Sequence, residues 1–506
     1  MSLILSSYVY DAAIETPLMY ATNLSTKTKN HVYLKREDLQ PVFSFKIRGA
    51  YNKLVNLTEE EKKAGVVACS AGNHAQGVAY AAKILGIKAK IVMPLLTPDI
   101  KWRNVERLGA TVVLHGDDFE GAKAECERLV KEEKLTNIPP FDDPYVIAGQ
   151  GTVGVEILKQ HRAQDIHAIF CAVGGGGLIA GIAAYVKRIC PKIKIIGVET
   201  HDANAMYSAL KEKHPINVGQ VGLFADGAAV SQVGLEPFKV SSEFVDEVIL
   251  VSNDEICAAI KDVFEDTRSV LEPAGALGTA GLKKYVQKYG VTEETLVSVA
   301  SGANIDFSKL RFVAERAELG ERREALISVV IPEKPGSFLR LHQQIYPRNV
   351  TEFSYRYSDP EEANIFMSFT TTDRDNELPL IIQNLEKEGF RATDISENEL
   401  AKEHGRYMIG GKSNLENEHL FSFQFPERPG ALHKFLVMIQ SSWNITMFHY
   451  RNKGHDIGRV LAAIQIPQTP NQKPGELPDE FISFLENLNY QYVDETNNPV
   501  FKQFFK

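Results

Sequence analysis

From about residue 30 to residue 300, short apolar runs rich in β-branched residues alternate with amphipathic helical stretches. Such runs stand at 90–93, 111–114, 168–171 and 195–198. Strands that are apolar along their whole length have to be covered on both faces, and the helices between them provide that cover. The pattern therefore predicts an α/β domain built around a parallel sheet.

Beyond Asn304 the pattern changes, and two motifs occur twice. The Pro-Glu-basic-Pro-Gly motif at Pro332 returns 94 residues later at Pro426. The Asn-x-Thr-x-Phe-x-Tyr-Arg motif at Asn349 returns 95 residues later at Asn444. Two paired matches in the same order indicate that a small domain is duplicated.

Each copy begins with an apolar strand, at 326–331 and at 420–425, and continues through a Pro-Gly turn into a helix. The second motif of each copy alternates with period two, as a half-buried strand does. These features predict two small α+β sandwiches. The charged helical stretch 310–319 is expected to form the neck between them and the first domain.

Length and charge narrow the classes of function. A chain of 506 residues is long enough for two to four domains of about 100 to 200 residues each. Its net charge is −9 and no basic block occurs, which argues against nucleic acid or a membrane surface as partner. We find no signal-like N-terminus and no apolar stretch near the roughly 20 residues of a membrane span, so a cytoplasmic protein is expected. Five scattered cysteines without CxxC spacing suggest neither disulfides nor zinc.

Lys46 lies in the segment SFKIRG at 44–49 and is the main candidate for covalent chemistry. A lysine can form a Schiff base with an aldehyde cofactor if its amine is held near the reacting carbon and can lose its proton. A single lysine is more often a solvated surface residue. Phe45 and Ile47 flank this one, however, and an apolar site lowers the pKa of an amine.

Four consecutive glycines, Gly174, Gly175, Gly176 and Gly177, connect an apolar strand to a helix. Glycines allow backbone N–H groups to approach a phosphate closely, and the positive end of the helix dipole adds to the attraction. An ordinary strand-to-helix turn rarely needs four glycines, so we expect a phosphate site. With Lys46, this run indicates pyridoxal phosphate.

The same run permits a second interpretation. Gly175, Gly177 and Ala180 fit the spacing GxGxx(G/A), and Glu199 follows at the end of the next strand, as in dinucleotide-binding domains. A dehydrogenase that uses NAD is therefore the alternative. It ranks second because it gives Lys46 no role.

Two further loops follow apolar strands. The segment SAGNHAQG at 70–77 places small residues before a helix, where hydroxyl and N–H donors suit a substrate carboxylate, while Asn73 can bond a phenolic oxygen. Ser70 is equally suited to capping the helix, and His74 is more typical of a structural residue. Ser301 ends the strand 296–300, at the edge where parallel sheets bind ligands.

Through SFKIRGAY, SAGNHAQG, GGGGL, the turn 301–304 and the C-terminal repeats, the chain resembles the biosynthetic threonine dehydratases over nearly its full length. The resemblance implies the tryptophan-synthase-β-like fold (fold type II) of pyridoxal-phosphate enzymes, followed by two ACT-like regulatory domains. It implies conversion of L-threonine, and also of L-serine, to a 2-oxo acid and ammonia, as the first step toward isoleucine. A non-catalytic amino-acid sensor is the remaining alternative.

The resemblance also implies roles for individual residues. Lys46, flanked by Phe45, carries the cofactor; Asn73 bonds the ring hydroxyl; Gly174 to Gly177 and Leu178 hold the phosphate; and Ser301 meets the pyridine nitrogen. Ser70, Ala71, Gly72 and His74 are expected to surround the substrate.

Departures from related enzymes sharpen this expectation. Serine racemases carry a second serine where this chain has Ala71, so racemisation is not expected. Their divalent-metal site begins at the position of Glu199, but its second carboxylate position falls at Ala205, so no metal is expected.

The resemblance further implies isoleucine as feedback inhibitor and valine as a counteracting ligand. Tyr355 and Tyr450 stand at equivalent positions of the repeats and are the candidate effector-binding residues, although packing on a strand face would explain them equally well. We expect a catalytic domain over 1–320, ACT-like domains over 325–397 and 419–490, and a homotetramer.

Overall fold

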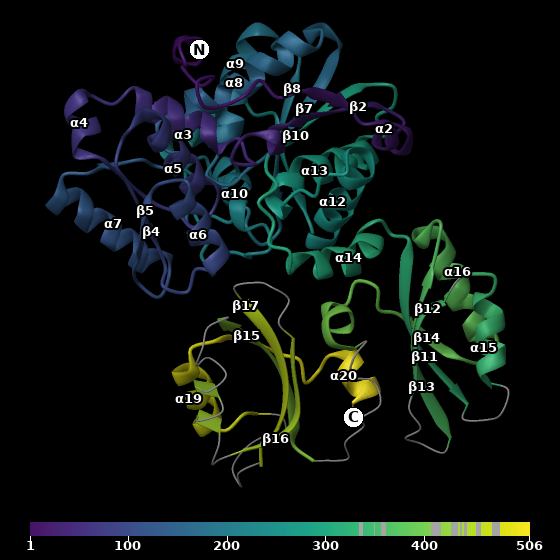
Figure 1. Cartoon of the computed structure of the whole chain (residues 1–506). Coiled ribbons are helices and arrows are strands. Elements are labelled where there is room, and N and C mark those ends of the chain that lie inside the picture. The colour runs from purple at the N-terminus through teal and green to yellow at the C-terminus, as the bar shows by residue number, and fades with distance from the viewer. Residues whose placement is uncertain are drawn as a thin grey trace. The chain divides into compact units, whose positions relative to one another are not determined.

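The computed structural model describes residues 1–332, 337–348, 350–355, 361–405, 416–426, 434–435, 438–439, 443–451, 457–467 and 476–505. For residues 338–339, 342, 353–355 and 444–451 only the backbone is described. The chain divides into two compact units, Met1–Ala317 and Glu318–Lys506 (Figure 1). Within these ranges, no helix is both long and apolar enough to cross a membrane.

The first unit contains a six-stranded sheet. Its strand order is β1 (Leu18–Tyr20), β2 (His31–Arg36), β10 (Thr295–Ala300), β7 (Ile166–Ala172), β8 (Lys194–Thr200) and β9 (Glu247–Val251). All neighbours are parallel except the edge strand β1, which pairs antiparallel with β2. The predicted strands at 168–171 and 195–198 are confirmed as parts of β7 and β8.

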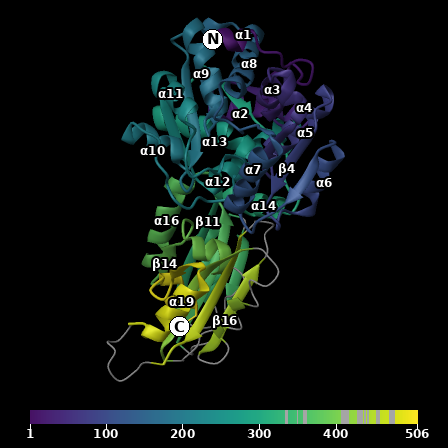
Figure 2. The ribbon, with the colours of Figure 1, turned by 90° about the vertical axis from the view of Figure 1, so that its left-hand side faces the viewer.

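Helices cover both faces of this sheet, because successive strand residues point to opposite sides. On one face Phe170 and Val198 pack against α12 (Asn253–Thr267) and α13 (Pro273–Tyr289), beside α2 (Thr22–Thr28). On the other face Ile169 packs against α9 (Gly177–Ile189), next to α8 (Pro144–Gln160) and α11 (Leu235–Phe244). Figures 1 and 2 both show α12 and α13 side by side. The expected doubly covered parallel sheet is confirmed.

A second, smaller parallel sheet completes the unit. Its order is β5 (Thr111–Leu114), β4 (Ala89–Met93), β3 (Val66–Cys69) and β6 (Thr136–Asn137). The helices around it are α3 (Lys46–Val55), α4 (Glu59–Ala64), α5 (Asn73–Leu85), α6 (Asp99–Arg107) and α7 (Phe119–Glu133). The short elements of the unit are α1 (Ser2–Leu5), η1 (Glu37–Leu39), η2 (Ala163–Asp165), α10 (Ala205–Glu212) and η3 (Asp226–Ala228).

The predicted neck is the helix α14 (Lys309–Gly320), and the duplication follows it. The first antiparallel sheet has the order β12 (Val350–Tyr355), β13 (Glu362–Thr370), β11 (Glu324–Pro332), β14 (Arg391–Asp394), with helices α15 (Ser337–Ile345) and α16 (Arg374–Lys387). The second has β16 (Asn444–Arg451), β17 (Ile457–Gln465), β15 (Glu418–Pro426), β18 (Gln491–Asp494), with helix α19 (Asp479–Leu488). The predicted first strand of each copy is thus confirmed, whereas both Pro-Gly turns lie outside the described residues.

The two copies share one strand register. Glu324 of β11 pairs with Thr370, and 94 residues later Glu418 of β15 pairs with Gln465. The pairing of the edge strand shifts between Val350 and Glu352 in the first copy, and between Ile445 and Met447 in the second. The threonine of the repeated motif is therefore the extra residue of a β-bulge in both copies.

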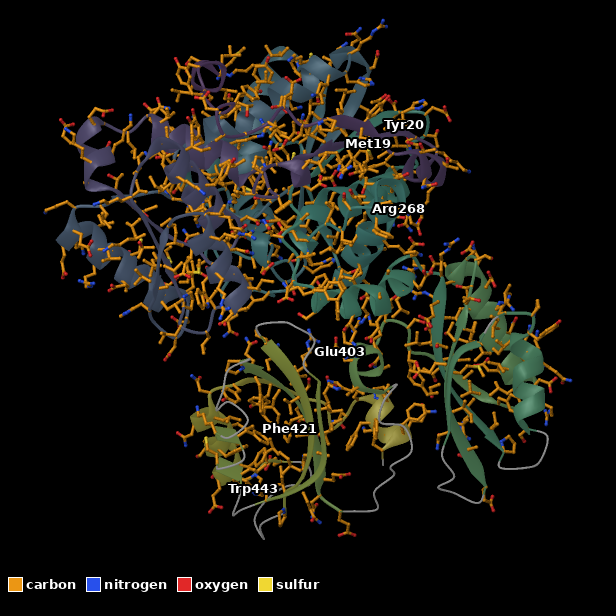
Figure 3. All side chains as sticks on the ribbon, in the orientation of Figure 1. Met19, Tyr20, Arg268, Glu403, Phe421 and Trp443 are labelled. Carbon is orange, nitrogen blue, oxygen red and sulfur yellow. The ribbon has the colours of Figure 1, made fainter. Side chains whose placement is uncertain are left out.

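The copies pack different side chains on this shared backbone. The first core is mainly aliphatic, with residues such as Ile327 and Ile365. The second is rich in aromatic rings, among them Phe421 and Trp443, which Figure 3 labels. The ring centroids of Trp443 and Phe481 lie 4.8 Å apart in an edge-on arrangement.

The elements α20 (Pro499–Phe504) and η4 (Ala401–Gly405) contribute residues to an apolar cluster that both copies share. Phe504 of the second copy packs on Phe366 of the first, with ring centroids 6.3 Å apart. Ser328 of β11 donates to Gln503 of α20. One apolar cluster contains residues of both copies, so the two copies form a single folded unit.

Candidate active site

Lys46 begins helix α3 and is held against the turn that follows β10. Ser44 and Gly302 form an antiparallel bridge, and the N–H of Phe45 donates to the carbonyl oxygen of Ser301 at 3.2 Å. The N–H of Ala303 donates back to the carbonyl oxygen of Phe43 at 2.8 Å. Two segments from opposite ends of the unit, both predicted to serve the site, are thus brought together.

The amine of Lys46 points toward the loop before α8. Its Nζ donates to the carbonyl oxygen of Pro140 at 3.0 Å and lies 5.4 Å from the ring centroid of Phe45. Burial lowers the pKa of this amine to about 8, although the negative charge of Glu272 partly offsets the shift. An ordinary surface lysine has a pKa near 10.4, so the predicted effect of apolar surroundings is present.

The four glycines lie between β7 and α9, as the sequence indicates. A side chain at Gly175 would overlap the ring of Phe141, which follows the Pro140 that holds the lysine amine. Gly176 has a φ of +92°, a left-handed conformation that favours glycine. Gly177 begins the 13-residue helix α9, and Leu178 is buried behind it in the core.

This region of the structure fits the phosphate of the expected cofactor. The glycines leave backbone without side chains at the positive end of α9, and Phe141 packs there next to Pro140, whose carbonyl oxygen accepts from the amine of Lys46. The site therefore offers an amine of low pKa for the aldehyde and a glycine-lined anion site for the phosphate. Pro140 contacts the amine and Phe141 contacts the glycines, so two consecutive residues connect these two groups.

Asn73 begins α5 and belongs to a chain of side-chain hydrogen bonds. Its Nδ2 donates to Oε1 of Glu272 at 2.5 Å, and its Oδ1 accepts from Nδ2 of Asn304 at 2.6 Å. The Nδ2 of Asn304 also donates to the carbonyl oxygen of Val42 at 2.9 Å. Burial, reinforced by the charge of Asp226, raises the pKa of Glu272 to about 7.

Sequence reasoning did not assign Glu272 or Asn304 to the site. Asn304 lies within the predicted turn 301–304, but nothing in that turn indicates a partner 231 positions earlier in the chain. Glu272 precedes Pro273 at the start of α13, a pattern that predicts only a helix beginning.

The loop 70–72 connects β3 to α5. Oγ of Ser70 accepts from the N–H of Gly72 at 3.3 Å, whereas Ala71 packs partly against the small-sheet core. His74 is buried, and its Nε2 lies 2.8 Å from the carbonyl oxygen of Ile138. Burial and the charge of Lys46 lower the pKa of His74 to about 3, so its ring is neutral at physiological pH.

Ser301 and Glu199 complete the residues that the sequence singled out in this unit. Ser301 is buried, and its Oγ lies 3.4 Å from the carbonyl oxygen of Ala274. Both carboxylate oxygens of Glu199 accept backbone N–H groups, from Met206 and Tyr207 at 2.8 Å each. Glu199 thus caps α10, which gives it a structural task and weakens the dinucleotide interpretation.

The first turn of α3 is fixed by buried charges. The guanidinium of Arg48 donates to Glu37 at 2.7 Å and to Glu156 at 2.6 Å, and Lys35 pairs with the same Glu156 at 2.5 Å. The side chains of these residues are at most 1% exposed. The helix that carries Lys46 is therefore anchored two residues beyond it.

Neither candidate effector residue lies in this unit. The backbones of Tyr355 and Tyr450 pair with Ile365 and Val460, at equivalent points of the edge strands β12 and β16. The structure describes the backbone of these two residues but not their side chains. In the part of the chain that the structure describes, no group of three or more His, Cys, Asp or Glu side chains is placed to hold a metal ion.

Comparisons with known proteins agree with this geometry. Residues 9–302 match the family of pyridoxal-phosphate dependent enzymes. Residues 315–404 and 409–505 match the C-terminal regulatory domain of threonine dehydratase.

Individual relatives match the whole chain. The mitochondrial threonine dehydratase of Schizosaccharomyces pombe is 56% identical over 100% of this chain and 84% of its own length. The biosynthetic L-threonine dehydratase of Burkholderia multivorans is 50% identical over 99% of this chain and 98% of its own.

Among solved structures, the processed form of tomato threonine deaminase isoform 2 is 51% identical, with a TM-score of 0.62 over 63% of this chain and 87% of that one. A serine racemase from Dictyostelium discoideum is 32% identical, with a TM-score of 0.56 over 60% of this chain and 98% of that one.

Proposed function

Because the chain belongs to the pyridoxal-phosphate-dependent biosynthetic threonine dehydratases, we propose that it converts L-threonine to 2-oxobutanoate and ammonia at the site around Lys46. The observation that carries the assignment is the pairing of the Lys46 amine with the glycine run through Pro140 and Phe141. L-Serine, which has the same hydroxyl at its β-carbon, is proposed as a second substrate.

We assign the cofactor contacts as follows. Lys46 would hold the aldehyde carbon, Asn73 the ring hydroxyl, Ser301 the pyridine nitrogen, and residues 174–178 the phosphate. Phe45 would flank the ring. When bound, pyridoxal phosphate supplies an electron sink for negative charge at the α-carbon of the substrate.

Lys46 is the proposed base of the reaction. At pH 7.5 an amine with a pKa of about 8 is neutral in about a quarter of the molecules, whereas at an ordinary lysine pKa it is neutral in about one in a thousand. Only the neutral amine can accept the α-proton of threonine. The buried position therefore makes this residue effective at neutral pH.

The loop 70–72 is proposed to bind the carboxylate of the substrate. It precedes α5, whose positive end favours an anion, and Ser70 adds a hydroxyl donor. Ala71 has no group that could deliver a proton to the opposite face of the α-carbon, so we propose elimination without racemisation. His74, neutral and bonded to the backbone at Ile138, is proposed to shape this pocket.

The second unit is proposed to bind isoleucine as inhibitor and valine as its antagonist. Its match to the family's regulatory domain supports this role, and Tyr355 and Tyr450 occupy equivalent edge-strand positions. Inhibition requires that isoleucine bind the less active state better, and threonine must then weaken isoleucine binding by the same factor.

We propose a homotetramer, and the domain ranges 1–320, 325–397 and 419–490. A cytoplasmic location is proposed from the sequence. The relatives that match include bacterial proteins and proteins named as mitochondrial or chloroplastic. Fluorescent tagging of the full-length protein would test the location.

Replacing Lys46 by alanine tests the proposed function. We expect Lys46→Ala to form no 2-oxobutanoate, and borohydride to attach the cofactor to residue 46 of the unaltered protein. Lys63→Ala, which removes an exposed lysine of α4, is the matched control and should retain full activity. A Lys46→Ala protein with unaltered activity would refute the assignment, and release of NADH in place of ammonia would favour the dehydrogenase alternative.

The pH dependence of cofactor uptake tests the state of the amine. The neutral amine is the form that reacts with an aldehyde, so the rate at which the cofactor-free protein binds pyridoxal phosphate should rise with pH and level off above about 8. A rate that continues to rise toward pH 10 would show that Lys46 is an ordinary lysine.

A further inference from the structure

Glu272 stands where the main parts of the proposed site meet. Its N–H donates to the carbonyl oxygen of Gly302 at 3.2 Å, and its carboxylate accepts from Asn73 at 2.5 Å. Gly302 in turn bridges to Ser44, two residues before Lys46. Glu272 thus contacts the turn after β10 through its backbone N–H and the start of α5 through its carboxylate, and Gly302 connects it to the segment that carries the lysine.

We propose that Glu272, together with Asn304, is a positioning residue that orients the Asn73 carboxamide toward the cofactor ring. This inference rests on the proposed function, because it assumes that Asn73 bonds the ring hydroxyl.

The order of donors and acceptors fixes the orientation of Asn73. The carbonyl oxygen of Val42 can only accept, so the group of Asn304 that faces it must be Nδ2. That Nδ2 also donates to Asn73, which identifies the atom it meets as Oδ1. Nδ2 of Asn73 is therefore turned toward Glu272, and one of its two hydrogens remains for the cofactor.

The carboxylate occupies space that a side chain at position 302 would need. A Cβ at Gly302 would overlap Oε1 of Glu272. Substitution at Gly302 would displace the carboxylate and break its bond to Asn73.

Charged groups from four elements face Glu272. Asp226 of η3 raises the pKa of Glu272, whereas Lys309 of α14 and Lys101 of α6 lower it. In return, the charge of Glu272 raises the pKa of Lys46 on α3. With a pKa of about 7, Glu272 loses its charge as the pH falls through neutrality, and the charge-assisted bond to Asn73 weakens.

Cofactor affinity measures this role separately from activity. Full-length protein freed of cofactor is titrated with pyridoxal phosphate, and binding is followed by protein fluorescence. We expect Glu272→Ala to raise the dissociation constant about tenfold, the effect of losing a hydrogen bond to a charged group. Glu272→Gln keeps an acceptor for Asn73 and should raise it about threefold or less. Glu255→Ala, which removes the capping carboxylate at the start of α12, is the matched control and should not change it.

A double-mutant cycle tests whether both partners act through Asn73. Asn304→Ala should also raise the dissociation constant, and Glu272→Ala with Asn304→Ala should raise it less than the product of the single effects. In the unaltered protein the affinity should fall with falling pH because both the Lys46 amine and Glu272 become protonated, and in Glu272→Gln this fall should be shallower because only the lysine contributes.

Unchanged affinity in Glu272→Ala would overturn the inference, as would strictly multiplicative effects of the two variants. If Glu272→Ala does not fold, a Glu272→Gln protein whose affinity depends on pH as steeply as that of the unaltered protein would overturn it as well. These outcomes differ from a failure of the proposed function, in which the unaltered protein would form no 2-oxobutanoate.

Discussion

Both units of the molecule bury basic side chains, but they treat the acidic partners differently. In the first unit Arg48 is enclosed with Glu37 and Glu156, and all three side chains are at most 1% exposed. In the second unit Arg374 is 4% exposed, yet its partner Glu397 is 67% exposed. The first arrangement is a closed set of charges, and the second is open to water.

The different exposure of the acidic partners matches the precision that each unit requires. The closed set anchors α3 two residues from the lysine amine, where a small movement would displace the reacting atom. Because no water can replace a lost partner there, the geometry is strongly specified. In the duplicated unit solvent screens the open pair, so it contributes little to the register that the repeated strands already set.

Arg48→Met should have the largest effect, because it leaves two buried carboxylates with Lys35 as their remaining cation. We expect a loss of about 3 to 5 kcal/mol in the stability of the first unit. Hydrogen exchange of α3 peptides and cofactor affinity would measure it. Adding Glu37→Gln should recover part of the loss, since it removes an unpaired charge.

Arg103→Met is the matched control for this experiment. Arg103 pairs with Asp99 on the surface of α6, where the two side chains are 67% and 70% exposed. We expect no measurable change in the unfolding midpoint, because water replaces the lost partner. Equal effects of the two substitutions would abolish the distinction between closed and open charges.

Phe504→Ala tests the duplicated unit at its shared core. Phe504 is 3% exposed and packs across the copies on Phe366. A cavity of this kind should cost about 3 kcal/mol. Because the cluster contains residues of both copies, calorimetry should show both destabilised in one transition, with the isoleucine response lost and basal activity retained. A loss confined to the second copy would show that the copies fold independently.

Thr351→Val tests a buried carboxylate that accepts a hydrogen bond from a threonine hydroxyl. Oγ1 of Thr351 lies 2.5 Å from Glu324, which is 8% exposed, and 2.6 Å from Oγ of Ser368. Removing the hydroxyl should cost about 1 to 2 kcal/mol of the stability of the second unit, measured by urea unfolding. Thr351→Ser keeps the hydroxyl and should recover most of the loss; equal losses would point to the β-bulge backbone instead.

The sequence predicts those features that depend on neighbours along the chain. The repeat offsets of 94 and 95 residues predicted two equivalent copies, and glycines after an apolar strand predicted the cradle before α9. Lys46 and Ser301 are both predicted as site residues because each lies within a recognisable motif.

Other features depend on contacts between distant segments and leave no local pattern. Glu272 meets Asn73 across 199 positions, and Arg48 meets Glu156 across 108. Hydrophobic periodicity places a helix face, but it cannot indicate which buried arginine faces which glutamate. A charged residue on an apolar helix face suggests a buried ion pair, but its partners can be identified only from the structure.

Glu397→Gln should have the smallest effect, because the carboxylate of Glu397 is mostly in water and Arg374 keeps its bond to the carbonyl oxygen of Glu324 at 3.2 Å. The amide of glutamine can still accept from the guanidinium. We expect a change below about 0.5 kcal/mol in urea unfolding, and one that shrinks further as salt is raised. A loss comparable to that of Arg48→Met would mean that the second unit also depends on a closed set of charges. The two units would then differ in the exposure of the acidic partners but not in how much the ion pairs contribute to the free energy of unfolding.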